Sequence, residues 1–202
     1  MQKNYLIAAF EHTLAERFPA QSEALQQDAF RRMDALRADY AGASKELWRH
    51  LEGQIIPGIA IYQTLQTVLP QEEALQLVHG YVEQRAWRIR AVFLRILKVP
   101  GLYRKIPHIF AKGVDKMFGA SAGFTAVQHE ATRDTIRFDM VRCPYHTACV
   151  QYGCPELCPC FCDSDDITYN NLHPNLLWHR TRTLGRGDDC CDFGLSLRRN
   201  VP

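Results

Sequence analysis

Thiols and carboxylates are concentrated in one short stretch of this 202-residue chain, from Cys154 to Asp166. Like charges repel and exposed thiols oxidise, so this density is costly unless the residues are used. The stretch therefore predicts a functional loop at 154–166, and residues 143–193 are expected to carry the chemistry. Its four cysteines and four acidic residues are Cys154, Cys158, Cys160, Cys162, Glu156, Asp163, Asp165 and Asp166.

One chemistry that suits such residues is nucleophilic catalysis by a cysteine. It needs positive charge or a helix N-terminus to lower the thiol pKa, and a neighbouring group to handle the proton. A single histidine is more often a hydrogen-bonding residue than a catalyst, and a cysteine such as Cys149 or Cys160 can equally be a small buried apolar residue. The candidate partners in the same third of the chain are His146, His173, His179, Arg180 and Arg182.

The other chemistry is metal binding. Cys154 and Cys158 have the spacing of half a zinc site, and Cys190 or Cys191 would supply the rest. Adjacent cysteines rarely ligate one tetrahedral ion together, which weighs against zinc or an iron–sulfur cluster. The three aspartates could instead hold magnesium or manganese, although the glycine and glutamate of a calcium loop are absent. The residue pattern is compatible both with a bound divalent metal (Mn, Zn or Fe) and with a site that uses no metal.

The elements that must position these residues are helical in the first two thirds of the chain. Apolar residues recur at helical spacing over 22–40, from about 44, over 59–69, and after Pro70. Pro100-Gly101 must end the last of these helices, because proline cannot continue a helix. This region, 1–120, is expected to be a helical scaffold.

After residue 120 the pattern changes to that of strands and turns. Residues 135–141 alternate apolar and polar types, 145–153 read as a short helix, and 176–184 and 191–197 read as strands joined by a glycine-containing hairpin turn at 185–188. Strand alternation lets at most one of the adjacent Cys190 and Cys191 join the site readily. The prediction is an α+β fold: helices packed on a small antiparallel sheet, with 121–202 as a Cys-rich catalytic region in one compact unit.

Composition excludes several classes of protein. The net charge of +2 is too small to make nucleic acid the main partner. The basic stretch at 85–116 could be an RNA or membrane-surface patch but fits a solvated helix face better. One or two of its arginines could also point inward to hold an anionic substrate. No membrane span and no secretory signal are expected, so the protein is expected to be cytoplasmic with reduced cysteines. The sequence does not determine whether the protein forms an oligomer.

An ordered series of motifs over about 140–195 resembles the L-2-amino-thiazoline-4-carboxylic acid hydrolase family. The motifs are Cys143-Pro144, Gly153-Cys154-Pro155-Glu156-Leu157-Cys158, Phe161-Cys162-Asp163-x-Asp165, His173-Pro174-x-Leu176-x-Trp178, and Arg180-Thr181-x-Thr183-Leu184-Gly185-x-Gly187-x-x-Cys190-Cys191-Asp192-Phe193. The resemblance implies hydrolytic opening of a cyclic isothiourea that bears a carboxylate, a step in making cysteine. A nucleophile must then add to the carbon between sulfur and two nitrogens, and an acid must protonate the leaving group.

Roles for this sequence follow from the resemblance and the clustering. Cys162 is expected as nucleophile or metal ligand, and Asp163 or Asp166 as base or metal partner. Arg180 is expected to bind the substrate carboxylate, since a guanidinium can do so bidentately, and Asp192 to orient Arg180 or a histidine. The remaining candidates are His173 for catalysis, Thr181 and Thr183 for substrate binding, and Cys154, Cys158 and Cys191 as ligands of a metal.

Two alternatives to a cysteine nucleophile stay open. A metal-activated water would perform the same hydrolysis with Cys162 as a ligand. A non-enzymatic binding module, loosely similar to small-molecule-sensing domains of the vinyl-reductase-associated type, would retain a ligand or metal on the cysteine cluster without turning it over.

Overall fold

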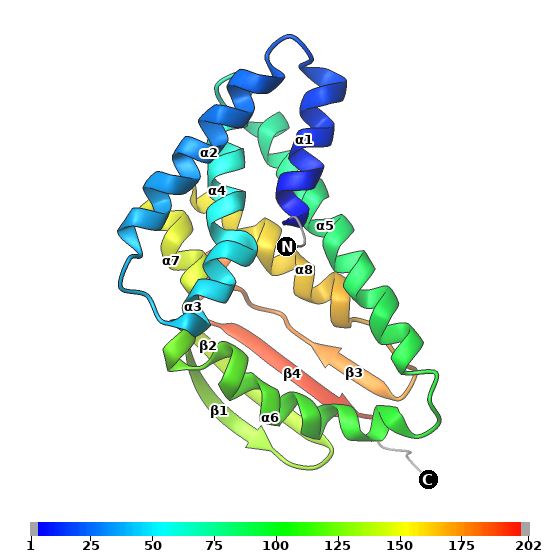
Figure 1. Ribbon diagram of the computed structural model, residues 1–202. Helices are drawn as coiled ribbons and strands as arrows, with labels where there is room; N and C mark the ends of the chain where they lie inside the picture. Colours follow the sequence, from blue (N-terminus) through cyan, green and yellow to red (C-terminus); the bar gives the residue numbers. More distant parts are fainter. Residues whose placement is uncertain (1–3, 199–202) are drawn as a thin grey trace.

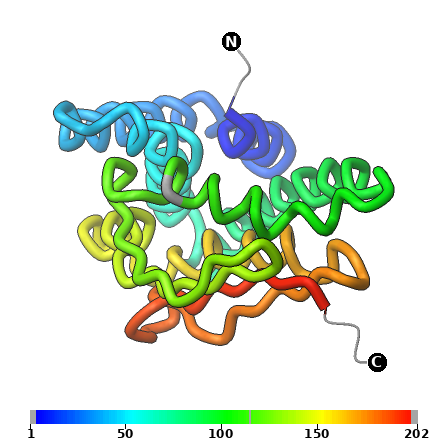
Figure 2. The backbone as a smooth tube through the Cα atoms, turned by 90° about the horizontal axis from the view of Figure 1, so that it is seen from below, coloured from blue at the N-terminus to red at the C-terminus, as the bar shows by residue number. Residues whose placement is uncertain are grey.

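Helices occupy the first part of the chain in the computed structural model, which describes residues 4–198. Figure 1 shows α1, α2, α4 and α5 above the sheet. Helix α6 contacts β1, β2 and β4, and Figure 2 shows it on the side of the sheet that faces the other helices. The long helix α5 ends at Ile96, shortly before Pro100-Gly101, as predicted. The helical elements are α1 (Tyr5–Arg17), α2 (Ser22–Asp39), α3 (Lys45–His50), η1 (Leu51–Ile55), α4 (Ile56–Leu65), α5 (Gln71–Ile96), η2 (Leu102–Lys105), α6 (Ile106–Phe118) and η3 (Ala120–Ala122).

A single π-helical turn, η1, joins α3 to α4, so that 45–65 run as one helix rather than the two expected from the sequence. Pro57 has no N–H to donate to the Gly53 carbonyl four residues earlier. The Asn4 side-chain amide donates to that carbonyl at 3.1 Å and to the Glu52 carbonyl at 2.8 Å. Asn4 also caps α1, because its Oδ1 accepts from the Leu6 N–H at 2.9 Å. The wide turn is thereby tied to the start of the chain.

The sheet has four antiparallel strands in the order β1-β2-β4-β3. Its strands are β1 (Thr125–Ala131), β2 (Thr135–Arg142), β3 (Leu176–His179) and β4 (Cys191–Leu197). The α+β prediction is confirmed, and Ile136, Phe138 and Met140 share the buried face of β2 as expected. The sequence did not indicate β1, whose residues are almost all exposed.

The predicted strand 176–184 is too long, because the chain leaves the sheet after His179. Beyond that point side chains capture the backbone N–H groups: Asp192 accepts from Thr181 at 2.8 Å and Arg182 at 2.6 Å, and Asp188 accepts from Thr183 at 2.7 Å. A short 3-10 turn, η5 (Leu184–Arg186), follows. The connection between β3 and β4 is therefore a structured loop rather than a tight hairpin.

The Cys-rich stretch is helical, and the expectation of a loop at 154–166 is wrong. It forms η4 (Pro155–Leu157) and α8 (Cys158–Tyr169), preceded by α7 (Pro144–Gln151). Proline is tolerated in the first turn of a helix, where its missing N–H has no partner anyway, so Pro155 and Pro159 start these elements. Cys158, Cys160 and Phe161 are buried in the helical core, against α5 and α4.

Candidate active site

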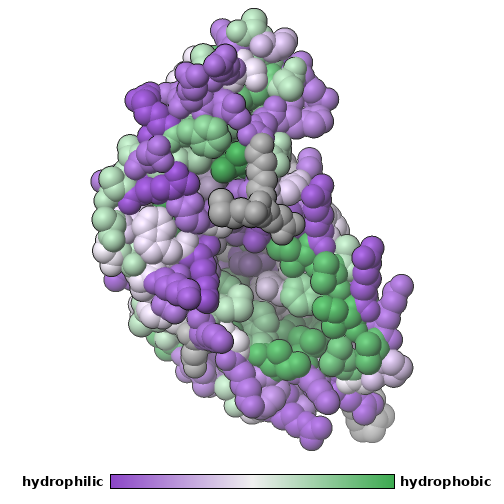
Figure 3. Space-filling model, in the orientation of Figure 1, coloured by the Kyte–Doolittle hydropathy of each residue, from purple (hydrophilic) through white to green (hydrophobic). Residues whose placement is uncertain are grey.

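A cavity of about 440 Å³ lies between α3–η1, α5, α6, α8 and the sheet. Figure 3 shows the face on which the molecule is hollowed, with apolar side chains gathered beside the hollow. Aromatic rings make up much of its wall: Phe93, Phe110, Phe118, Phe124, Phe138, Tyr145, Phe161, Tyr169, Trp178 and Phe193. A cavity of this size and lining is typical of small-molecule sites.

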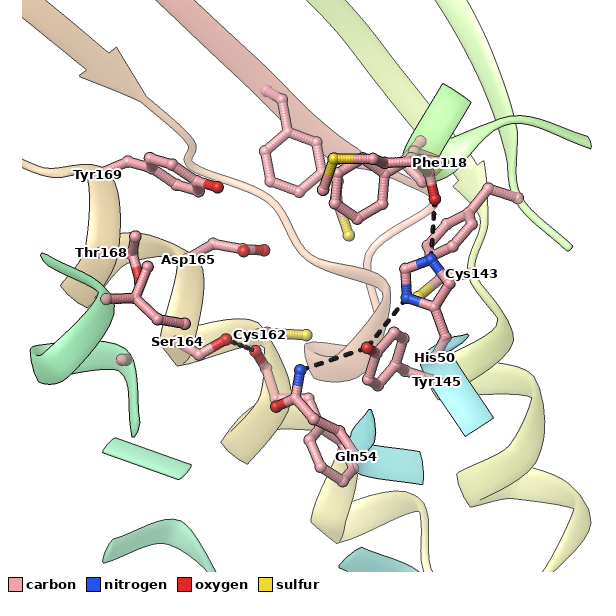
Figure 4. A pocket seen from close by; sticks show the side chains of 18 of the residues that line it. His50, Gln54, Phe118, Cys143, Tyr145, Cys162, Ser164, Asp165, Thr168 and Tyr169 are labelled. Carbon is pink, nitrogen blue, oxygen red and sulfur yellow. Dashed lines mark hydrogen bonds between the residues drawn. The ribbon is translucent and has the colours of Figure 1, made fainter. Parts of the chain in front are cut away.

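One face of α8 supplies the reactive groups of the cavity. Cys162, Asp165 and Tyr169 follow one another at helical spacing and all line it, and Figure 4 shows the Cys162 thiol and the Asp165 carboxylate pointing into it. Asp163 lies outside the cavity, where it accepts from Arg186 at 2.6 Å and lies 3.3 Å from Nε2 of His79. Of the three aspartates on α8, only Asp165 therefore lies on the helix face that lines the cavity.

Arg180 anchors the acidic end of α8. Its side chain is 2% exposed, its Nη2 donates to the Asp166 carboxylate, and its Nη1 lies 3.7 Å from Oδ2 of Asp165. That Nη1 has no hydrogen-bond partner among the described residues. Asp166 also accepts from the Trp178 indole at 2.8 Å, so it is fully engaged outside the cavity.

Asp165 has an unusual environment for a carboxylate. Burial raises its pKa most, the Arg180 guanidinium lowers it and the neighbouring Asp166 charge raises it, and the balance of the three places the pKa at about 6. The side chain is 39% exposed, but that surface faces the cavity rather than the outside of the protein. Asp165 is therefore an ionisable group that gains and loses a proton near neutral pH inside an aromatic pocket.

The Cys162 thiol is protonated in this environment. A hydrogen bond with the Cys158 thiol and burial together raise its pKa far above the usual range, and Cys158 in turn bonds to Cys149. Burial also raises the pKa of Cys143 to about 12 and that of Cys191 to about 11. A nucleophilic thiolate would thus need a base to take its proton during the reaction.

The end of α3 and the π-turn each direct one polar side chain toward the cavity, His50 and Gln54 respectively. His50 Nε2 lies 2.8 Å from the Met117 carbonyl, which can only accept, so Nε2 carries the proton of the neutral ring and Nδ1 accepts from the Tyr145 hydroxyl at 3.2 Å. Gln54 donates to the same hydroxyl at 3.3 Å (Figure 4). Burial lowers the pKa of His50, which keeps it neutral. The Gln54 Oε1 is buried and has no partner among the described residues.

Arg85 is one of four cationic residues that line the cavity, with Arg49, Lys116 and Arg180. It lies half-buried on α5, and its charge lowers the pKa of both Tyr145 and Tyr169, although burial dominates for each tyrosine. No ion pair joins Arg85 to a carboxylate among the described side chains. Unlike Arg180, it is free to meet a negatively charged ligand.

Several residues expected at the site lie elsewhere. His173 stacks on Tyr103 with ring centroids 4.1 Å apart, and its Nδ1 accepts from the Asn175 N–H. Thr181 and Thr183 do not line the cavity. Asp192 accepts hydrogen bonds from the backbone of the β3–β4 loop and from the Thr181 hydroxyl. Of its two expected partners, it lies 3.7 Å from Nε2 of a histidine, His179, and does not contact Arg180, and neither it nor His179 lines the cavity.

The cysteines considered as metal ligands are separated by their positions in the fold. Cys154 and Cys158 are buried in the helical core, whereas Cys191 lines the cavity and Cys190 does not. Among the described residues, no three or more histidine, cysteine or acidic side chains are arranged to hold a metal ion. The expected ligand set of Cys154, Cys158 and Cys191 therefore does not fit a metal here.

Sequence reasoning gave no role to His50, Gln54 or Tyr145. It included Arg85 only in the basic stretch, where an inward-pointing arginine was one alternative, and it included Asp165 only among the aspartates that could hold a hard cation. The spacing 162–165–169 would have grouped Asp165 with Cys162 had the stretch been recognised as helical. No local pattern marks His50, because its partner Tyr145 lies 95 residues away.

The fold and the cavity define an α+β protein with a small-molecule pocket that combines thiols, carboxylates and arginines with a largely aromatic wall. A family model described as L-2-amino-thiazoline-4-carboxylic acid hydrolase matches residues 48–195, and the chain belongs to this family. The match includes η1, α5 and α8 and most of the sheet, and all the residues that line the cavity except Glu46 lie within it. No curated protein and no solved structure gives a significant match. Across residues 4–198, no helix combines the length and apolar character needed to cross a membrane.

Proposed function

We propose that the protein hydrolyses a small cyclic isothiourea or amidine that carries a carboxylate, with 2-amino-thiazoline-4-carboxylate as the reference compound. The family to which the chain belongs supports this substrate class. The observation that carries the proposal is Asp165: a carboxylate with a pKa of about 6, one helical turn from Cys162 and open to an aromatic cavity. A base is most effective when its pKa lies near the working pH.

The charges of the cavity match the two ends of such a substrate. The Asp165 carboxylate can accept the N–H groups of the amidine-like end, and Arg85 can bind the substrate carboxylate because it forms no ion pair with any of the described acidic side chains. Arg180, expected from the sequence to bind that carboxylate, instead holds Asp165 and Asp166. Its free Nη1–H still points to the acidic end of the cavity.

In the simplest reaction, Asp165 activates a water molecule. The water oxygen bonds to the carbon between sulfur and the two nitrogens, and its proton passes through Asp165 to the ring nitrogen. A carbonyl then forms as a ring carbon–sulfur or carbon–nitrogen bond breaks, and the hydroxyl proton passes to the leaving atom. The product is an open-chain carbamoyl compound with a free thiol or amine, and water is the only co-reactant.

A covalent route differs only in the first nucleophile. Asp165 would take the proton of Cys162 as its sulfur adds to the same carbon, and that proton would pass to the ring sulfur or nitrogen as the ring bond to it breaks. Water would then add to the carbon held by Cys162, and the bond to the Cys162 sulfur would break, which returns a proton to the thiol and releases the carbamoyl compound. The Cys162→Ser variant separates the routes, because a water mechanism retains most of its turnover whereas a thiol nucleophile loses it. Cys160→Ser is the matched control: Cys160 is buried on α8 but does not line the cavity.

The proposal is tested by incubating the reduced protein with 2-amino-thiazoline-4-carboxylate and following products by mass spectrometry. We expect conversion by the wild type, a loss of about 100-fold or more for Asp165→Asn, and little change for Asp163→Asn, which alters a carboxylate on the same helix outside the cavity. Equal losses in both aspartate variants would remove Asp165 from the mechanism. Ligand retention without any conversion would instead assign the chain to non-enzymatic binding modules.

A further inference from the structure

The cavity is much larger than the reference ring requires. A five-membered ring with an amino group and a carboxylate fills roughly 130 Å³, if each non-hydrogen atom takes about half the ~30 Å³ of a liquid water molecule. The cavity holds about 440 Å³. We propose that the natural substrate carries a bulky apolar group, aromatic or branched aliphatic, attached to the cyclic isothiourea or amidine carboxylate. This inference rests on the proposed function and narrows its substrate class.

A continuous set of aromatic rings forms the end of the cavity that the small ring would leave empty. Tyr169 is its centre, with Phe93 at 5.8 Å, Phe110 at 5.5 Å and Trp178 at 5.0 Å between ring centroids. Trp178 continues to Phe193 at 5.7 Å. We refer to these five rings as the aromatic subsite. Edge and tilted arrangements of this kind leave ring faces and edges free to pack against another aromatic group.

The position of the reactive groups separates the two ends of the cavity. Cys162 and Asp165 precede Tyr169 on one face of α8, and four residues of α-helix advance about 6 Å. When the ring carbon of a substrate lies beside Asp165, an apolar group joined to the ring through one short linker therefore reaches the aromatic subsite. Arg180 lies between the two ends, with its guanidinium carbon 5.7 Å from the Phe193 ring centroid.

The surface beside the mouth is also apolar. Apolar side chains gather next to the hollow in Figure 3. A charged ring alone would leave these side chains and the aromatic subsite in contact with water. A phenyl-sized group that buries roughly 100 Å² of its own apolar surface there should improve binding by about 50-fold.

The test compares 2-amino-thiazoline-4-carboxylate with analogues that carry a methyl or a benzyl group on ring carbon 5. We expect kcat/KM to rise from the parent to the benzyl compound by at least about tenfold, mainly through a lower KM. The Phe110→Leu variant should reduce the ratio of benzyl to parent kcat/KM by about threefold or more. Phe30→Leu, which changes an exposed ring on α2 away from the cavity, should preserve that ratio.

The outcomes separate this inference from the proposed function. Efficient hydrolysis of the parent with no gain for the larger analogues would overturn the apolar substituent and leave the hydrolase intact. Tighter calorimetric binding of the benzyl analogue without turnover of any compound would keep the aromatic subsite and overturn the hydrolase. Absence of both binding and turnover would overturn both.

Discussion

The pH dependence of turnover is the most direct measure of the proposed base. With a pKa of about 6, Asp165 is about 9% ionised at pH 5, whereas an ordinary aspartate with a pKa near 3.8 would be about 94% ionised. Because the base must be ionised to take a proton, kcat/KM should rise with pH and level off above about pH 7. At pH 5 it should be roughly one tenth of its plateau.

Substitution of Arg180 should shift the pH dependence of kcat/KM. Its positive charge, 3.7 Å from Asp165, favours the ionised carboxylate, so its removal should raise the pKa of Asp165 by about 1–3 units. The ascending limb of kcat/KM for Arg180→Gln should therefore shift from about pH 6 to about pH 7–9. Circular dichroism at each pH separates this shift from unfolding.

The matched control for that experiment is Arg186→Gln, which removes a guanidinium paired with Asp163 outside the cavity. For Arg186→Gln, the ascending limb of kcat/KM should stay near pH 6. A wild-type rate that is flat down to pH 5, or an Arg180→Gln limb that stays at pH 6, would refute the reasoning that burial and Arg180 set the protonation of the base.

Three further substitutions test how the site is built. Gly185→Ala should lower the free energy of unfolding by about 1–3 kcal/mol in denaturant titrations, since its Cβ would lie 3.0 Å from the Cys162 sulfur. Asn4→Ala should cost about 1–2 kcal/mol in the same assay, because it removes a helix cap and leaves carbonyls of the π-turn unpaired. Arg85→Met should raise KM for the carboxylate substrate by about 10–100-fold with a smaller change in kcat, and Arg88→Met on the same helix should not.

Each of these has a clear contrary result. For Gly185, the comparison is Gly42→Ala, where an added Cβ meets nothing within 4 Å, and equal effects would contradict the close approach of η5 to α8. An unchanged unfolding midpoint for Asn4→Ala would show that water satisfies the π-turn equally well. If Arg85→Met leaves KM unchanged, the residue that binds the substrate carboxylate would instead be Arg180, through its unpaired Nη1.

The sequence determined the features that depend on local pattern. The confinement of all eight cysteines to the last third and the ordered motifs from Cys143 to Phe193 identified the family before any geometry was known. Alternation placed Ile136, Phe138 and Met140 on the buried face of β2, and Pro100-Gly101 limited α5. The order of helices followed by strands gave the α+β class. These signals are local because they follow from backbone periodicity and the chemistry of proline.

The tertiary structure decided which of the chemically similar residues form the site. Asp163, Asp165 and Asp166 are equivalent in sequence, but the packing of α8 against α5 turns only Asp165 into the cavity, and burial beside Arg180 then sets its pKa. His50 and Gln54 reach Tyr145 across more than 90 residues of sequence. Helix phase, burial and long-range contacts are properties of the packed chain, so no local pattern could supply them.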